Sequence, residues 1–118
     1  MDQNKLAQSL YERFNAGDID GVVELLRPNV AWVNEPKGQY IQGKEKLHAI
    51  WSEQGKVAKI HFEIISVTPR DKGMFVVVRE KVWKLLDELI FDGPVGHDYT
   101  ILDGKIARCD IVDAYPAE

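Results

Sequence analysis

The sequence predicts an α+β domain in which helices pack on one face of a curved antiparallel sheet. Apolar residues recur at spacings of three and four in the first half of the chain, which is the period of a helix with one buried face. From Val57 onward, runs of β-branched and aromatic residues alternate with turn residues, as in consecutive strands. Helices followed by strands indicate the α+β class. With 118 residues, 45% of them hydrophobic, residues 1–118 are expected to form a single domain.

Three helices are expected before the sheet. The first covers residues 4–16 and ends at Gly17. The second begins at Asp18, whose carboxylate can accept hydrogen bonds from the free amides of the first turn, and it cannot extend past Pro28. The third covers residues 44–55.

The strands follow from their composition. A short strand is expected over residues 30–34, and the stretch 36–43 is expected to be a loop. Five later stretches are also predicted to be strands: 58–67, 73–83, 88–91, 94–102 and 105–112. The connections contain turn residues at 69–73 and at 92–94, and the Asp-Gly pair at 103–104 is a strong hairpin signal. We expect these strands to form an antiparallel meander.

The strand at residues 75–83 fits the core in two phases. In the first phase, four residues face inward: Val76, Val78, Glu80 and Val82. In the second phase, five residues do so: Phe75, Val77, Arg79, Lys81 and Trp83. Both faces are half apolar, as expected if one lines the core and the other meets a partner subunit. If the first phase is inward, Glu80 is a buried acid and becomes a site candidate.

Charge and composition exclude several kinds of partner. The net charge is −4 and the pI is near 5.4, so we expect no nucleic-acid partner, because phosphate binding needs clustered Lys and Arg. No apolar run approaches the roughly 20 residues of a membrane span, and the first residues lack the apolar stretch of a signal peptide. We therefore expect a soluble cytoplasmic protein that does not contact a membrane. The lone Cys109 allows no internal disulfide and no thiolate metal cluster.

The histidines do not form a metal-binding pattern. None of His48, His61 and His97 stands three or four residues from another, so no metal is expected. His48 lies one turn from Trp51 on the third predicted helix, where it is either a pocket residue and general base or a half-exposed helix flank. His97 adjoins Asp98, so the two side chains are expected on opposite faces of one strand.

Four stretches resemble, in order, the landmarks of the nuclear transport factor two-like superfamily: "FNAGDIDGVVELL" (14–26), "VAWVNEP" (30–36), "IQGKEKLHAIW" (41–51) and "LDGKIARCDIV" (102–112). That group includes ketosteroid isomerases, SnoaL-like polyketide cyclases and limonene epoxide hydrolases. The resemblance covers nearly the whole chain. It implies a cystatin-like, cone-shaped α+β barrel, whose curved antiparallel sheet wraps around the three N-terminal helices and leaves a largely apolar pocket. It also implies a homodimer through the outer face of the sheet.

The resemblance implies two catalytic carboxyls. Glu35, at the end of a strand and just before Pro36, matches the general base of the ketosteroid isomerases; the other interpretation is a solvated turn residue. Asp98 matches by spacing the acid that stays protonated and donates to the oxyanion; the other interpretation is a residue that caps the strand or faces solvent. The family's oxyanion Tyr falls on Leu10, with Tyr11 one residue along and about 100° around the helix.

The epoxide hydrolase pattern is matched incompletely. It uses an Asp, Arg, Asp set, in which Arg79 fits the Arg but Lys81 stands in the place of one acid. Asp110 supplies the last acid only after a one-residue deletion that inverts the face of its strand. The other interpretation is a lattice of ion pairs on the outer face of the sheet.

Aromatic residues are the remaining candidates for a ligand pocket. We expect a small apolar molecule to contact six residues: Tyr11, Phe14, Trp32, Tyr40, His48 and Trp51. The first hypothesis is a cofactor-independent isomerase, cyclase or lyase, in which Glu35 moves a proton on an apolar carbonyl compound and Asp98 polarises its oxygen. The second is a non-catalytic module that binds a hydrophobic metabolite. The third is a structural dimer whose cavity is filled by its own aromatic side chains, and epoxide hydrolysis is a minor alternative.

Overall fold

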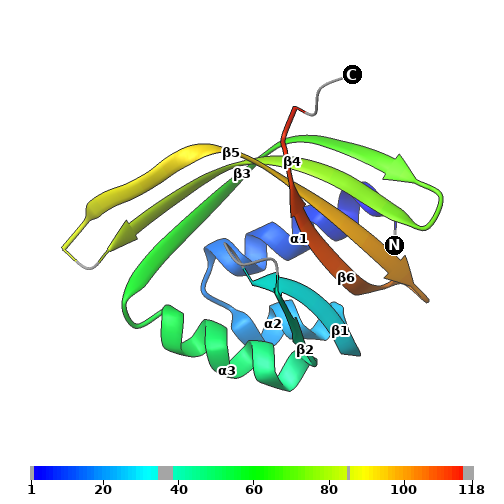
Figure 1. Cartoon of the computed structure of the whole chain (residues 1–118), viewed down its shortest axis with the longest axis horizontal. Helices are drawn as coiled ribbons and strands as arrows, with labels where there is room; N and C mark the ends of the chain where they lie inside the picture. Colours follow the sequence, from blue (N-terminus) through cyan, green and yellow to red (C-terminus); the bar gives the residue numbers. More distant parts are fainter. Residues whose placement is uncertain (1, 35–38, 85, 116–118) are drawn as a thin grey trace.

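The three helices lie in the first half of the chain, and the sheet arches over them (Figure 1). In the computed structural model the described residues are 2–34, 39–84 and 86–115. Their elements, in order, are α1 (Gln3–Asn15), α2 (Ile19–Glu24), β1 (Leu26–Asn34), β2 (Gln39–Gln42), α3 (Lys44–Gln54), β3 (Ala58–Arg70), β4 (Gly73–Lys84), β5 (Glu88–Leu102) and β6 (Lys105–Val112). The α+β class, with a curved sheet over N-terminal helices, is confirmed.

Local sequence signals set most of the element ends. Asp18 caps α2 by accepting a hydrogen bond from the amide of Gly21 at 2.9 Å, as predicted. The hairpin between β5 and β6 turns at Asp103 and Gly104, whose φ angles are 52° and 77°. Positive φ at both central residues is the requirement of a two-residue type I′ turn, and Asp-Gly satisfies it at low cost.

The six strands form one open sheet in the order β2-β1-β6-β5-β4-β3. The chain from β3 to β6 is an antiparallel meander, as predicted. β1 lies parallel to β6, and β2 pairs with β1 inside the stretch that was predicted to be a loop. These two pairings join segments that no local pattern connects, and they complete the sheet.

The predicted turn at residues 92–94 is wrong, because β5 runs through it without a break. Asp92 pairs with Lys81 and Pro94 pairs with Arg79 across the β4–β5 ladder. The described pairing of β5 with β6 begins only at Gly96. Pro94 therefore lies where β6 does not cover β5, a position that tolerates a residue without an N–H group.

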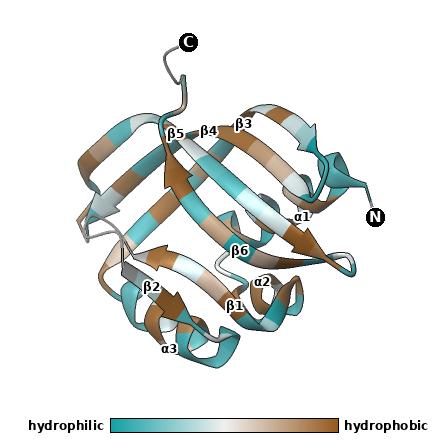
Figure 2. Cartoon of the chain, turned by 45° about the vertical axis from the view of Figure 1, so that its right-hand side comes forward, coloured by the Kyte–Doolittle hydropathy of each residue, from teal (hydrophilic) through white to brown (hydrophobic). Residues whose placement is uncertain are grey.

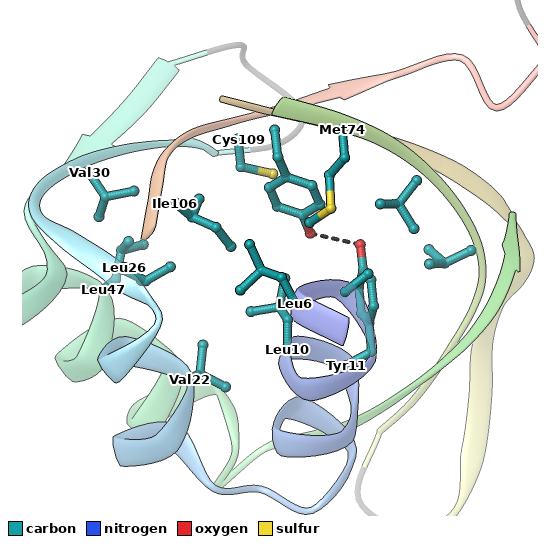
Figure 3. Packing of buried hydrophobic residues seen from close by; sticks show 14 residues of the cluster. Leu6, Leu10, Tyr11, Val22, Leu26, Val30, Leu47, Met74, Ile106 and Cys109 are labelled. Atoms are coloured by element: carbon teal, nitrogen blue, oxygen red, sulfur yellow. Dashed lines mark hydrogen bonds between the residues drawn. The ribbon is translucent and has the colours of Figure 1, made fainter. Parts of the chain in front are cut away.

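The core lies between the helices and the concave face of the sheet (Figure 3). Its buried members are Leu6, Ala7, Leu10, Tyr11, Val22, Leu26, Val30, Leu47, Met74, Val76, Val78, Tyr99, Ile106 and Cys109. Hydrophobic and hydrophilic residues alternate along the strands, as expected for a sheet with one covered face (Figure 2). Met74, Val76 and Val78 belong to this core, so the first phase of β4 faces inward and places Glu80 on the inner side.

None of the helices in the described ranges is long and apolar enough to cross a membrane.

Candidate functional site

An aromatic cluster fills the space where the helices meet the inner face of the sheet. It consists of Tyr11 and Phe14 on α1, Trp32 on β1, Trp51 on α3 and Phe62 on β3. Ring centroids lie 5.0 Å apart between Trp32 and Trp51, 5.1 Å between Phe14 and Trp51, and 5.2 Å between Tyr11 and Phe62. Tyr11 is buried and the other four are partly buried. The structure thus brings together four of the six residues predicted to contact a ligand.

A chain of hydrogen bonds begins inside this cluster. The hydroxyl of Tyr11 lies 2.7 Å from Nδ1 of His97 and 2.7 Å from the hydroxyl of Tyr99. The three residues form the Tyr99–Tyr11–His97 chain, of which Figure 3 shows the bond from Tyr11 to the second tyrosine. All three side chains are buried. They lie together because His97 and Tyr99 share the inner face of β5, two residues apart, and α1 carries Tyr11 across that face.

Burial sets the charge state of His97. It lowers the pKa of the imidazole to about 4, so the ring is neutral at neutral pH. Nε2 of His97 has no hydrogen-bond partner among the described residues, and in that part of the chain no fully buried side-chain nitrogen or oxygen lacks a partner. Of the whole His97 residue, 6% of the surface is still accessible.

Glu80 is a carboxyl group on the inner face of β4, the strand that pairs with β5 and so lies beside His97 and Tyr99. It pairs with Phe62 on one side and with Gly93 on the other. Glu80 is partly buried and forms no ion pair with any residue in the described ranges, and this desolvation raises its pKa. Burial also raises the pKa of Tyr11, and the negative charge of Glu80 adds to that increase.

Phe62 connects Glu80 with the hydrogen-bonded chain. Its ring lies 5.8 Å from that of His97 and is the cross-strand neighbour of Glu80. His97 pairs with Val76, which lies four residues along β4 from Glu80, or about 13 Å along the strand at roughly 3.3 Å per residue. The partly buried Val95 lies between them on β5. A flat ligand resting on Phe62 and Val95 could contact both polar groups.

Asp98 lies on the opposite face of β5 from His97 and Tyr99. Its carboxylate accepts a hydrogen bond from Arg70 at 3.5 Å, and 37% of its side chain is exposed. This corrects the orientation expected from the resemblance. His97 and Tyr99 face inward, so Asp98, which lies between them in the strand, faces outward. The structure does not bring Asp98 to the aromatic cluster.

Two further residues predicted to contact a ligand also lie away from the cluster. His48 is 2.6 Å from the carboxylate of Asp20, a contact that links α3 to α2 at the surface. Tyr40 is 43% exposed; its hydroxyl donates to Asp110, and its ring lies 4.6 Å from the guanidinium of Arg108. Glu35 lies outside the described residues, so its role as a base stays a prediction.

The epoxide hydrolase set is not assembled by the described residues. Arg79 donates two hydrogen bonds to Asp92, at 2.8 and 2.9 Å, and lowers the pKa of that carboxyl. Asp110 is held instead by Arg108, at 2.8 Å. Both pairs are solvent-exposed, so ion pairs on the outer face of the sheet describe these residues better than a catalytic set.

Sequence reasoning did not select His97 or Tyr99 as site residues. The signal was present as alternation in "VGHDYTI", residues 95–101, but the predicted break at 92–94 left the phase of this strand open. In the described part of the chain, no three His, Cys, Asp or Glu side chains converge on a position that could hold a metal ion. Two surface depressions lie elsewhere, one around the first residues of α3 and one over Arg79 and Asp92.

Known structures share this architecture. A candidate polyketide cyclase from Pseudomonas putida superposes with a TM-score of 0.82 at 22% identity, covering 96% of this chain and 92% of that one. TerC, co-crystallised with polyporic acid, superposes with a TM-score of 0.80 at 19% identity, covering 93% and 89%. An LEH-like epoxide hydrolase from Mycobacterium tuberculosis does so with a TM-score of 0.80 at 12% identity, covering 91% and 78%. At these identities the likeness concerns the fold alone.

No curated protein matches the sequence. The model of the SnoaL-like domain matches residues 7–109, which include most of α1, the whole of β1 to β5 and most of β6. The match therefore spans both the helices and the sheet that enclose the aromatic cluster. The chain belongs to the SnoaL-like domain family.

Proposed function

We propose that this protein catalyses proton transfer on a small apolar carbonyl compound without a cofactor, as an isomerase, cyclase or lyase. The observation that carries the proposal is Glu80, a carboxyl group on the inner face of β4 whose pKa is raised by desolvation. A carboxylate with a raised pKa is a stronger base, and its pKa lies closer to the operating pH of a general base. The aromatic cluster supplies a wall for a flat, apolar ligand.

Glu80 is the base that we favour among the described residues. It is paired with no cation in that part of the chain, whereas Asp92 and Asp110 are held by arginines that lower their pKa values. A carboxylate neutralised by a guanidinium is a weaker base. Glu35 is retained as a second candidate for the same step, because its position after β1 fits the family pattern.

The relatives support a small-molecule ligand. The Pseudomonas putida protein is a candidate polyketide cyclase, and TerC was crystallised with polyporic acid. Both share the fold of this chain. We infer a ligand of that general kind for this chain, namely a flat organic molecule with at least one carbonyl oxygen.

The test is exchange of the α-hydrogens of 2-tetralone, a bicyclic ketone, in deuterated water, followed by proton NMR. The wild-type protein should accelerate exchange, and Glu80→Gln should reduce the acceleration about 10²- to 10⁴-fold, the usual contribution of a general base. Glu63→Gln is the matched control, because Glu63 is an exposed residue of the neighbouring strand β3. Glu35→Gln, measured in parallel, tells which carboxyl moves the proton.

Two outcomes would contradict the proposal. An exchange rate equal to that in buffer, with 2-tetralone bound, would favour a non-catalytic binding module. Full activity in Glu80→Gln together with loss in Glu35→Gln would move the base to the end of β1.

A further inference from the structure

The hydrogen bonds of the Tyr99–Tyr11–His97 chain have a direction. The Tyr11 oxygen contacts both Nδ1 of His97 and the hydroxyl of Tyr99, but it carries a single hydrogen. Either Tyr11 donates to Nδ1 and accepts from Tyr99, or Nδ1–H donates to Tyr11, which then donates to Tyr99. Because the neutral imidazole has one N–H, the first direction places its hydrogen on Nε2 and the second leaves Nε2 bare.

Acid and base strength favour the first direction. A phenol hydroxyl is a far stronger acid than the N–H of a neutral imidazole, and an imidazole nitrogen is a stronger base than a phenol oxygen. The hydrogen bond is therefore stronger when the Tyr11 hydroxyl donates to Nδ1 than when Nδ1–H donates to Tyr11. At the other end of the chain the buried thiol of Cys109 lies beside the Tyr99 hydroxyl, and sulfur is a weak acceptor. The Tyr99 hydroxyl therefore forms a stronger hydrogen bond to the oxygen of Tyr11 than to the sulfur of Cys109.

We propose that Tyr11, held by Tyr99, fixes His97 as its Nε2–H tautomer, so that His97 donates a hydrogen bond to the carbonyl oxygen of the ligand. Tyr11 and Tyr99 are positioning residues, since they act through His97. The nature of the ligand rests on the proposed function, whereas the tautomer is a property of the free protein. A nitrogen that already carries a hydrogen cannot accept one, so the histidine polarises the oxygen and the carboxylate moves the proton.

The location of Nε2 supports this role. It is the ring nitrogen that Tyr11 does not contact, and it has no hydrogen-bond partner among the described residues. The His97 ring meets Phe62 edge-to-face at 71° and Tyr99 at 63°.

The direct test is NMR of the protein labelled with ¹⁵N in histidine, at neutral pH, with two-bond proton–nitrogen correlations. For His97 we expect a pyridine-like Nδ1 and a pyrrole-like Nε2. A pyrrole-like Nδ1, or two nitrogens with the shifts of a charged ring, would overturn the proposal. His48 and His61 are internal references in the same spectrum, because neither belongs to the Tyr99–Tyr11–His97 chain.

Two variants separate tautomer control from general damage. Tyr11→Phe removes the partner of Nδ1, so the two tautomers should become mixed. Tyr99→Phe removes a hydroxyl one step further away and should keep the Nε2–H form, since Tyr11 can still donate. Equal spectra for His97 in wild type and Tyr11→Phe would show that Tyr11 does not set the tautomer.

Addition of 2-tetralone tests the ligand contact. The Nε2 resonance of His97 should move while Nδ1 stays pyridine-like, and an unmoved Nε2 would overturn the contact. If the tautomer is as expected but no hydrogen exchange occurs, the proposed function fails and the hydrogen-bond direction stands. If exchange occurs with the opposite tautomer, the inference fails and the proposed function stands.

Discussion

Two adjacent residues of β5, His97 and Asp98, show how differently the two faces of this sheet are built. His97 points inward, is 6% exposed, and meets the hydroxyl of Tyr11. Asp98 points outward to Arg70. Burial lowers the pKa of His97 to about 4 and keeps the imidazole neutral. Asp98 instead forms a solvent-exposed ion pair with Arg70. The side of the strand, more than the residue type, decides which chemistry a titratable group can perform.

The carboxyl groups repeat this comparison. The pKa of Glu80 on the inner face is raised by desolvation, whereas that of Asp92 on the outer face is lowered by the guanidinium of Arg79. The two residues are on neighbouring strands, and their environments shift them in opposite directions. Such separation of like groups agrees with the proton transfer that we propose for the inner face.

The largest difference between the faces is expected for apolar truncations. Ile106→Ala should lower the free energy of unfolding by about 2–5 kcal/mol, because Ile106 is fully buried and leaves a cavity. Leu102→Ala, at a residue 47% exposed near the end of β5, should change it by less than about 0.5 kcal/mol. Urea denaturation measures both, and equal losses would show that the outer residue is covered in solution.

The pH dependence of stability should reveal the inward histidine. His97 has a folded pKa of about 4 against 6.5 in the unfolded chain, so between these values only the unfolded state binds a proton. Stability therefore falls as the pH drops from about 6.5 to about 4, by on the order of 3 kcal/mol from this group.

His97→Asn removes this contribution while it keeps an acceptor for the Tyr11 hydroxyl. The difference in the free energy of unfolding between wild type and variant should decrease by on the order of 3 kcal/mol on going from neutral pH to about pH 4. Denaturation curves over this range check the prediction, and a difference that is independent of pH would mean that His97 has the same pKa in the folded and unfolded states.

Hydroxyl deletions provide a third contrast. Tyr11→Phe leaves Nδ1 of His97 and the hydroxyl of Tyr99 with a lost partner in a buried environment, which should cost about 1–3 kcal/mol. Tyr40→Phe removes a hydroxyl from an exposed cluster with Arg108, where water can replace it, and should cost less than about 0.5 kcal/mol. A larger loss for Tyr40 would indicate that the outer cluster is buried against another molecule.

The smallest effect is expected for Asp98→Asn. The ion pair with Arg70 is long and exposed, and such pairs contribute about 0–1 kcal/mol. Hydrogen exchange of 2-tetralone should be unchanged, because this carboxylate faces away from the aromatic cluster. A loss of exchange comparable to that of Glu80→Gln would restore Asp98 to the catalytic role that the resemblance implies.

Much of the candidate site was foreseeable, and the missing part has a clear cause. Tyr11, Phe14, Trp32 and Trp51 were selected as ligand contacts, since large aromatics on the apolar faces of predicted elements must pack inward. Asp98 was selected because its spacing matches the second acid of the ketosteroid isomerases, and the Asp-Gly-Pro stretch at 92–94, which suggests a turn, left the phase of the strand open. The uninterrupted β5 shows that pairing with β4 overrides that local preference.

The sequence by itself determined the three helices, the Asp18 cap, the Asp103–Gly104 hairpin and the α+β class, because these depend on residues within a few positions of one another. Only the tertiary structure decided the parallel pairing of β1 with β6 and the inward phase of β4 and β5. The Tyr99–Tyr11–His97 chain joins residues 86 and 88 positions apart. A strand shows the same alternation in either phase, so the face that it turns inward is chosen by the distant segments that pack against it.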